Sequence, residues 1–404
     1  MKPFSFVHVA DLHLGYEQYN LAIRREDFNR AFMEVVDKTL ELKPDFMIIA
    51  GDLFQHARPA NITLENAIKS FKRLKDAGIL ILAVDGSHDS APNIVTGTIL
   101  NPLDTAGLIY YLPRHEGASW RGDSYYIYGI PNFRTRRNTE RRLPKFLEVN
   151  KPTPDPSLFN IFVFHMALDI PSIIRRHPRI EAEASADLIP DGFDYYAGGH
   201  IHTPWKIPFK DGVLVYSGCT ETVSYEDARV SKGFYYVEVD GDGEPMIERI
   251  KLEGSRRFIV FEEDCSGLMP GQITDINVDL VRRFDEDEAI IIPVIRGVLP
   301  AEASRREIDV AKIRRAAEKA LLVHPVIQLR EADIPEEVIK AIFEGDLRSL
   351  KGKALSFFIE FFSQRYPKET AERIARLAFD IMQPLVKGDE GKVRSLVEDA
   401  LSER

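Results

Sequence analysis

The chain has 404 residues and a net charge of −10; 44% of its residues are hydrophobic and 29% are charged. This composition is typical of a folded globular protein with two or three domains, and it excludes a disordered chain or a disulfide framework. No secretion signal and no run of roughly 18 apolar residues is present, so we expect a cytoplasmic protein with no membrane contact.

Short β-rich runs alternate with amphipathic stretches over residues 1–255. Strands are predicted at residues 6–10, 46–50 and 79–84, and later at 125–128, 161–164, 213–216 and 234–237. Between the second and third strands, one helical face carries Leu64, Ala67, Ile68, Phe71 and Leu74. The alternation predicts an α/β core whose second half is richer in strands.

The pattern changes after residue 255. Residues 256–332 are predicted to form a small α+β module, with strands at 258–261, 290–295 and 326–329 and a helix at 310–322. Residues 333–404 are predicted to be entirely helical, with apolar stripes that include Phe357, Phe358, Phe361 and Phe362. Such stripes suit either an autonomous helical bundle or an interface with another protein, and the sequence leaves both open.

Metal-binding residue types follow the predicted strands. Asp11 and His13 form an alternating pair after the first strand, Asp52 follows the second strand, and Ser87 and His88 follow the third. In the second half, His165 ends a strand, and His200 and His202 form an alternating pair. Carboxyl ends of strands are where α/β sheets bind ligands, and an alternating pair on extended backbone directs both side chains to one side. Carboxylate with imidazole suits Mn²⁺, Fe²⁺ or Zn²⁺.

The ordered series of Asp11-x-His13, Gly51-Asp52, Gly86-Ser87-His88-Asp89, His165 and Gly199-His200-x-His202 resembles the calcineurin-like metallophosphoesterases. Within that superfamily, residues 11–16, 51–54 and 58–59 resemble the SbcD and meiotic-recombination-eleven nucleases of DNA double-strand-break repair. The resemblance implies a four-layer β-sandwich core flanked by helices at 1–255. It also implies a DNA-capping domain at 256–332, and at 333–404 a helical tail that docks on a partner ATPase.

Carried over by position, the resemblance implies a two-metal site, with Mn²⁺ as the preferred ion. Asp11, His13, Asp52 and His202 would bind one ion, and Asp52, His165, His200 and the residue at 87 would bind the second. A shared carboxylate fits the spacing of about 3.5–4 Å in two-metal phosphoesterases. His88 would be a catalytic residue that steadies the phosphate or protonates the leaving oxygen.

The chain departs from the family pattern at Ser87, where relatives have Asn. A serine hydroxyl is shorter and is a poorer metal ligand than an amide oxygen, so the second ion is expected to bind more weakly. Three functions stay open: a manganese-dependent exonuclease and endonuclease, a non-catalytic or weakly catalytic scaffold that binds DNA ends, and a phosphoesterase for another ester. The extra 150 residues favour the nuclease over a small-molecule phosphatase.

The resemblance also implies partners. They are double-stranded DNA ends, single-stranded DNA, an SMC-like ATPase such as SbcC, and a second copy of the chain. The amphipathic stretch 64–74 is either the homodimer interface or the face that covers the sheet. Arginines cluster at 134–142, 175–179 and 305–315, as phosphate contacts require, although each cluster also suits a solvated helix face.

Overall fold

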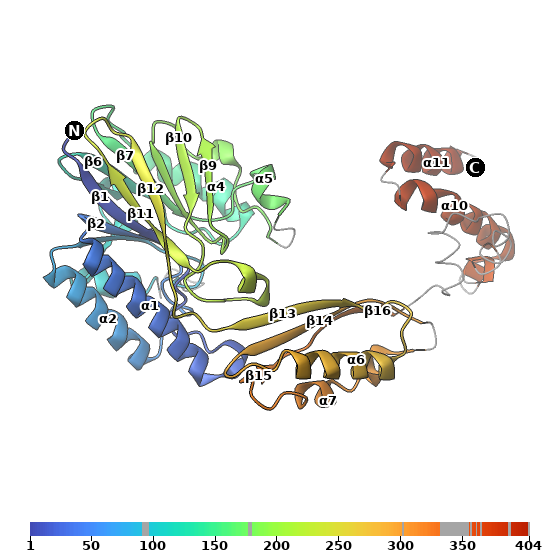
Figure 1. The fold of residues 1–404 in the computed structure, drawn as a ribbon. Coiled ribbons are helices and arrows are strands. Elements are labelled where there is room, and N and C mark those ends of the chain that lie inside the picture. Colours follow the sequence, from blue (N-terminus) through green and yellow to red (C-terminus); the bar gives the residue numbers. More distant parts are fainter. Residues whose placement is uncertain are drawn as a thin grey trace. The chain divides into compact units, whose positions relative to one another are not determined.

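A computed structural model describes residues 1–90, 97–176, 180–300, 303–331, 355, 358–360, 362–363, 366–386 and 389–402 (Figure 1). The chain divides into two compact units, Met1–Phe258 and Ile259–Arg404. Residues 332–354, at the start of the predicted helical tail, and Phe357, Phe361 and Arg179 lie outside the described residues. Over the described residues, no helix is long and apolar enough to cross a membrane.

The first unit contains two six-stranded sheets, and the first sheet has the order β12-β11-β1-β2-β3-β4. Its strands β1 to β4 are parallel, whereas β11 and β12 are antiparallel to their neighbours. The chain therefore returns after more than 200 residues to place β11 against β1. The bounds are Phe4–Val9 (β1), Phe46–Ala50 (β2), Leu80–Val84 (β3), Tyr110–Tyr111 (β4), Gly233–Val239 (β11) and Pro245–Lys251 (β12).

The second sheet has the order β5-β6-β7-β8-β10-β9. Its four inner strands are parallel, and the two outer strands are antiparallel to their neighbours. Both sheets thus present a row of parallel strand ends. The bounds are Ser119–Arg121 (β5), Tyr125–Gly129 (β6), Phe159–His165 (β7), Tyr195–Gly199 (β8), Trp205–Phe209 (β9) and Gly212–Tyr216 (β10).

Three hydrophobic clusters separate four layers. The first lies between the first sheet and helices α1 (Ala22–Leu42) and α2 (Asn61–Asp76). The second joins the inner faces of the two sheets, where Phe6 and Phe46 stack with ring centroids 5.1 Å apart. The third packs α4 (Arg136–Val149) and α5 (Pro171–Ile174) on the second sheet. This arrangement confirms the mixed α/β class with two central sheets flanked by helices.

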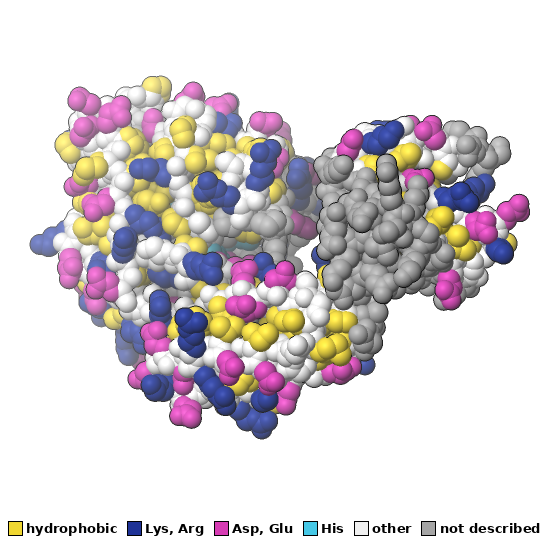
Figure 2. Space-filling view, turned by 45° about the vertical axis from the view of Figure 1, so that its right-hand side comes forward, with side chains coloured by type: hydrophobic (Ala, Val, Ile, Leu, Met, Phe, Trp, Pro, Cys, Tyr) yellow, Lys and Arg dark blue, Asp and Glu magenta, His cyan; other side chains and the backbone are white. Residues whose placement is uncertain are grey.

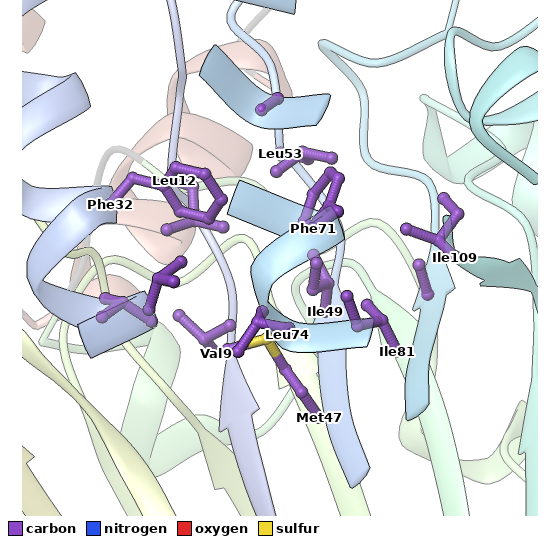
Figure 3. Close-up of a cluster of buried hydrophobic side chains, with 14 of the residues drawn as sticks. Val9, Leu12, Phe32, Met47, Ile49, Leu53, Phe71, Leu74, Ile81 and Ile109 are labelled. Carbon is purple, nitrogen blue, oxygen red and sulfur yellow. The ribbon is translucent and has the colours of Figure 1, made fainter. Parts of the chain in front are cut away.

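The first cluster also holds the loops that follow β1 and β2. Figure 3 shows Leu12 and Leu53 in the same group of buried side chains as Phe32 of α1 and Phe71 of α2. Leu12 and Leu53 have no exposed surface. Burial of these leucines fixes the two loops at the sheet edge. Since each leucine is adjacent to a candidate metal ligand, it also fixes the position of that ligand.

The apolar face predicted at 64–74 lies on α2. Ala67, Phe71 and Leu74 are fully buried against the first sheet, so this part of the predicted face covers the sheet. Ile62 and Ile68 of the same helix are 52% and 37% exposed. These two isoleucines therefore lie outside the buried face.

The second unit begins with a four-stranded sheet in which β14 (Ile290–Leu299) pairs in parallel with β15 (Leu322–Val323) and β16 (Val326–Glu331). The fourth strand, β13 (Phe258–Asp264), neighbours β14, and α6 (Pro270–Arg283) packs on the sheet. Two helices, α10 (Lys368–Val386) and α11 (Glu390–Ser402), are described further along the unit. Phe358 and Phe362 pack with Phe379 of α10 in a small apolar cluster.

The helix predicted at 310–322 is wrong in its length, because α7 covers only Val310–Arg314. The carboxylate of Asp285 accepts hydrogen bonds from the backbone amides of Glu318, Lys319 and Ala320 at 2.8, 3.1 and 2.9 Å. Leu322 then pairs with β14. These long-range bonds outweigh the local helical preference of residues 315–322.

A buried charge network joins α1 to the loop after β10. The guanidinium of Arg24 is fully buried, and it donates to Asp27 at 2.6 Å, to Glu221 at 3.2 Å and to Gln18 at 3.0 Å. Arg256 donates to the same Asp27 carboxylate from the end of the unit. One arginine therefore holds two acids that come from opposite ends of the first unit's sequence.

We expect Arg24→Met to lower the free energy of unfolding by about 3–5 kcal/mol, because it leaves buried carboxylates without one of their cations. Urea unfolding of the full chain measures the change. The control is Arg25→Met, which removes a partly exposed ion pair with Glu17 and is expected to cost under about 1 kcal/mol. Equal losses in the two variants would contradict the network's role.

The same network predicts a pH dependence of stability. Burial raises the pKa of Asp27, but hydrogen bonds from Arg256 and Arg24 outweigh burial and hold this pKa below its ordinary value of 3.8. A lowered pKa in the folded state contributes stability that is present above the ordinary pKa and is lost as pH falls below it. Urea unfolding should give a constant difference between the wild type and Asp27→Asn near neutral pH, and the difference should shrink below about pH 4. A difference that stays constant down to pH 3 contradicts this.

Candidate metal centre

The candidate residues come together because parallel strands of both sheets end at one place. Asp11 and His13 follow β1, Asp52 follows β2, and Ser87 and His88 follow β3. From the second sheet, His165 is the last residue of β7, and His200 and His202 follow β8. Cross-sheet contacts between Asp11, Asp52 and His165 join these two rows of strand ends.

Three overlapping groups of ligand atoms lie close together. Asp11 Oδ1 is 3.9 Å from His165 Nε2 and 4.0 Å from His202 Nε2. Asp52 Oδ2 is 3.2 Å from His165 Nε2 and 3.9 Å from His13 Nε2. Two ligand atoms that share one ion at about 2.1 Å lie roughly 3–4 Å apart, so these separations suit shared ions. The groups are Asp11, His13 and His202; His13, Asp52 and His88; and Asp11, Asp52 and His165.

His200 lies beside these groups without joining any of them. Its ring meets that of His165 with centroids 5.4 Å apart, and its Nε2 is 3.6 Å from Glu183 Oε2. The backbone amide of His200 donates to both oxygens of Asp11 at 3.1 Å. His200 therefore contacts the cluster through its backbone and faces a carboxylate that sequence reasoning did not identify.

The backbone around the ligands is not extended, so the expectation that alternation along a strand aligns Asp11 with His13 is wrong. Asp11, His13 and Asp52 have φ values of 54°, 46° and 49°, and His200 has 87°. Such left-handed conformations cost free energy in residues other than glycine and persist only where the surroundings impose them. Here backbone hydrogen bonds between the loops after β1 and β2 impose them, from His13 N to Asp52 O and from Leu14 N to Leu53 O at 3.0 and 2.9 Å.

Glycines in the motifs leave room for the ligands. A Cβ atom at Gly86 would lie 2.0 Å from Asp52 Oδ1, and one at Gly51 would lie 2.3 Å from His165 Nδ1. At Gly199 it would lie 2.0 Å from the carbonyl oxygen of Ala50. Each glycine is therefore required by the close approach of a ligand or of the strand that carries one.

Hydrogen bonds outside the cluster orient the imidazole rings. His165 Nδ1 lies 2.8 Å from the carbonyl oxygen of Ala50, and His202 Nδ1 lies 2.9 Å from Asp227 Oδ2. Carbonyl and ionised carboxylate oxygens only accept, so both rings carry a proton on Nδ1 and direct Nε2 toward the acids. Outer partners of this kind fix ring orientation and raise ligand basicity.

Two nearby acids were missed by sequence reasoning. Asp227 had one weak signal, the Ser224-x-x-Asp227 spacing of a capping box, which the structure contains. Glu183 had none, because it occurs in a stretch of alternating alanine and glutamate with no flanking motif. Both reach the histidines only through the tertiary fold.

Burial and neighbouring charges set the protonation of the rings. Burial lowers the pKa of His13 and that of His200 to about 3, so both are neutral with a free lone pair. Burial also lowers the pKa of His165, but the carboxylates of Asp52 and Asp11 outweigh it and raise this pKa to about 10. An ion that binds His165 therefore displaces a proton, as metal binding commonly does.

Cys219 lies near His202 and Asp227 but does not belong to the candidate site. Burial raises the pKa of its thiol to about 12, so the sulfur stays protonated at neutral pH. His202 Nδ1 already contacts Asp227, and the backbone amide of Cys219 donates to the carbonyl oxygen of His202 at 3.0 Å. Cys219 thus packs behind the histidine.

Comparisons with known proteins agree with this geometry. The calcineurin-like phosphoesterase family matches residues 4–204. The chain is 31% identical over 269 residues to the DNA double-strand break repair protein Mre11 of Methanococcus maripaludis, covering 63% of this chain and 68% of that protein. It is 30% identical over 327 residues to the protein of that name from Archaeoglobus fulgidus, covering 70% and 71%.

A third relative extends the similarity beyond the first unit. The DNA double-strand break repair protein Mre11 of Aeropyrum pernix is 26% identical over 409 residues, covering 97% of this chain and 95% of that protein. The similarity thus runs through both compact units. The chain belongs to the Mre11 family of calcineurin-like phosphoesterases.

Proposed function

We propose that this protein is a manganese-dependent nuclease that hydrolyses DNA phosphodiester bonds at a two-metal site during double-strand-break repair. One observation carries the proposal. The buried carboxylates of Asp11 and Asp52 lie 3.2–4.0 Å from imidazole Nε2 atoms contributed by both sheets. Donors of this type at this spacing suit divalent ions such as Mn²⁺, Fe²⁺ and Zn²⁺.

Buried ring nitrogens without hydrogen-bond partners support metal binding by these residues. Both ring nitrogens of His13 are buried without a hydrogen-bond partner among the described residues. Nε2 of His165 is also buried and has no partner with hydrogen-bond geometry there. Buried polar atoms are normally partnered, and a bound ion would satisfy them. Asp11, His13, Asp52 and His202 would hold one ion, and Asp52, His165 and His200 would contribute to the second.

The ions, when bound, would neutralise charge that develops on the scissile phosphate. The chain contributes positioning. The backbone amide of His88 donates to Asp52 Oδ1 at 2.9 Å, which orients a carboxylate that would hold both ions. Asp89 accepts from the amides of Phe54 and Gly86 at 2.8 and 2.9 Å, so it ties the loops after β2 and β3 together.

His88 is the proposed catalytic residue. Its Nδ1 lies 2.9 Å from the carbonyl oxygen of Gln55, so Nδ1 donates to that oxygen and Nε2 is the ring nitrogen left to act on a substrate. When protonated, Nε2 would donate to the phosphate or to the leaving oxygen. The ring centroid lies 5.0 Å from that of His13, which supports a position beside the proposed first ion.

DNA is the proposed substrate, in preference to another phosphate ester. The names of the relatives, DNA double-strand break repair proteins, support it, as does a similarity that continues into the second unit. Figure 2 shows Lys and Arg interspersed with Asp and Glu on the face in view, so phosphate contacts would come from local clusters. The exposed arginines of α4 are such a cluster: Arg136, Arg137, Arg141 and Arg142.

The proposed partners are an SMC-like ATPase of the SbcC type and a second copy of the chain. The helical segment of the second unit would bind the ATPase, in keeping with the family resemblance. The exposed isoleucines of α2, Ile62 and Ile68, support a contact between copies. The second candidate function is a scaffold that binds DNA ends without cutting them, and Ser87 is the observation that favours it.

We expect the protein to cleave labelled double- or single-stranded DNA with Mn²⁺ and His88→Ala to lower the rate at least about 100-fold, because the proton donor is lost. The control, His56→Ala, changes an exposed histidine nearby and should keep the wild-type rate. Equal rates in His88→Ala and the wild type contradict the catalytic role. No cleavage by the wild type with its partner ATPase, despite bound Mn²⁺, favours the scaffold.

We expect Asp227→Asn to weaken Mn²⁺ binding about 10- to 100-fold, because His202 loses the anionic acceptor that makes its ring a better ligand. The amide oxygen of Asn still accepts a hydrogen bond, so the fold should be kept. Calorimetric titration with Mn²⁺ measures the affinity, and the exposed neighbour changed in Glu226→Gln is the control. An unchanged affinity in Asp227→Asn would show that Asp227 does not act on the metal site.

A further inference from the structure

The second ion of the proposed site has an incomplete ligand set if the family pattern is applied as it stands. Asp52, His165 and His200 supply one carboxylate and two imidazoles. The remaining position falls on Ser87, whose hydroxyl group is shorter and a poorer ligand than the amide that the family resemblance implies there. A further donor close to His200 would complete the set.

Glu183 has the distance that such a donor needs. Its Oε2 lies 3.6 Å from His200 Nε2. Two atoms bound to one ion at about 2.1 Å each lie roughly 3–4 Å apart, whereas a direct hydrogen bond would be near 2.9 Å. The separation falls within the range of 3.2–4.0 Å that joins the carboxylates of Asp11 and Asp52 to the rings of the other candidate histidines.

The position of Glu183 is fixed by the backbone next to His165. Its amide donates to the carbonyl oxygen of Ala167 at 2.8 Å, and Leu168 forms a parallel bridge with Ala184. The amide of Ala167 donates back to Glu183 Oε2 at 3.3 Å. Ala167, two residues beyond the ligand His165, thus holds Glu183 through both its backbone amide and its carboxylate. The side chain of Glu183 is 14% exposed.

The surrounding charges connect Glu183 to the metal centre. Glu183 Oε2 lies beside His200 Nε2, and the backbone amide of His200 donates to both oxygens of Asp11. Burying a third carboxylate beside Asp11 and Asp52 is costly unless cations balance the charge. Two divalent ions would balance three carboxylates and leave one net positive charge for a phosphate.

We infer that Glu183 is a ligand of the second ion and occupies the coordination position that the family pattern gives to the side chain at 87. The inference rests on the proposed two-metal site. An anionic oxygen replaces a neutral one, so the second ion is bound at least as tightly as an amide would bind it. Ser87 is then no sign of a lost metal.

The test is calorimetric titration of the full chain with Mn²⁺, combined with electron paramagnetic resonance of the loaded protein. The wild type should bind two ions and give the spectrum of a coupled Mn²⁺ pair. Glu183→Gln should weaken one of the two ions about 10- to 100-fold, keep the other, and give the spectrum of isolated Mn²⁺. Gln keeps the acceptor for the amide of Ala167, so the metal-free protein should unfold at the wild-type temperature.

Two further variants sharpen the result. Glu181→Gln removes an exposed acid two residues away and should leave both affinities unchanged. Adding Ser87→Asn to Glu183→Gln should restore the weakened ion, because the amide oxygen refills the same position. Two ions with unchanged affinities in Glu183→Gln would overturn this inference alone. Fewer than two ions in the wild type would overturn the proposed function as well.

Discussion

Asp11 and Asp52 place two carboxylates at the ends of neighbouring strands, with 0% and 2% of their surface exposed. Burying such groups costs several kcal/mol each unless charges and hydrogen bonds compensate. The compensation comes from elements distant in sequence: the amide of His88 for Asp52, the amide of His200 for Asp11, and the His165 ring for both. The stacking of the two sheets, the left-handed loops and the motif glycines all serve to bring these partners to the carboxylates.

Local sequence patterns were sufficient to predict the strands and the side chains that follow them, because a buried strand is a short apolar run and its end carries the polar residue. The expected strand at 46–50 coincides with β2, for example. The helix expected at 310–322 begins at Val310 but ends at Arg314, because Asp285, some 33 residues earlier, binds the amides that would have continued it. Glu183 and Asp227 were missed for the same reason, since only the tertiary fold brings them to His200 and His202.

Asp11 and His13 lie close together as expected, but extended backbone does not bring them there. Alternation along a strand was expected to align them, yet both residues have positive φ and β1 ends at Val9. The buried Leu12 between them points into the core under α1 and α2, and this anchor sets the direction of its neighbours. Motif spacing therefore encodes a hydrophobic anchor as well as two ligands, as the pair Asp52 and Leu53 also shows.

The pairing of β1 with β11 has a consequence for how the chain folds. β1 lies in the middle of its sheet, where Phe4 faces Val239 across more than 200 intervening residues. Closing so long a loop is entropically costly, and folds dominated by such contacts form slowly. During synthesis, the first sheet stays incomplete, with an unpaired edge on β1, until β11 has left the ribosome. The nascent chain is thus exposed to edge-to-edge association over this interval, and chaperone dependence is expected to be greatest there.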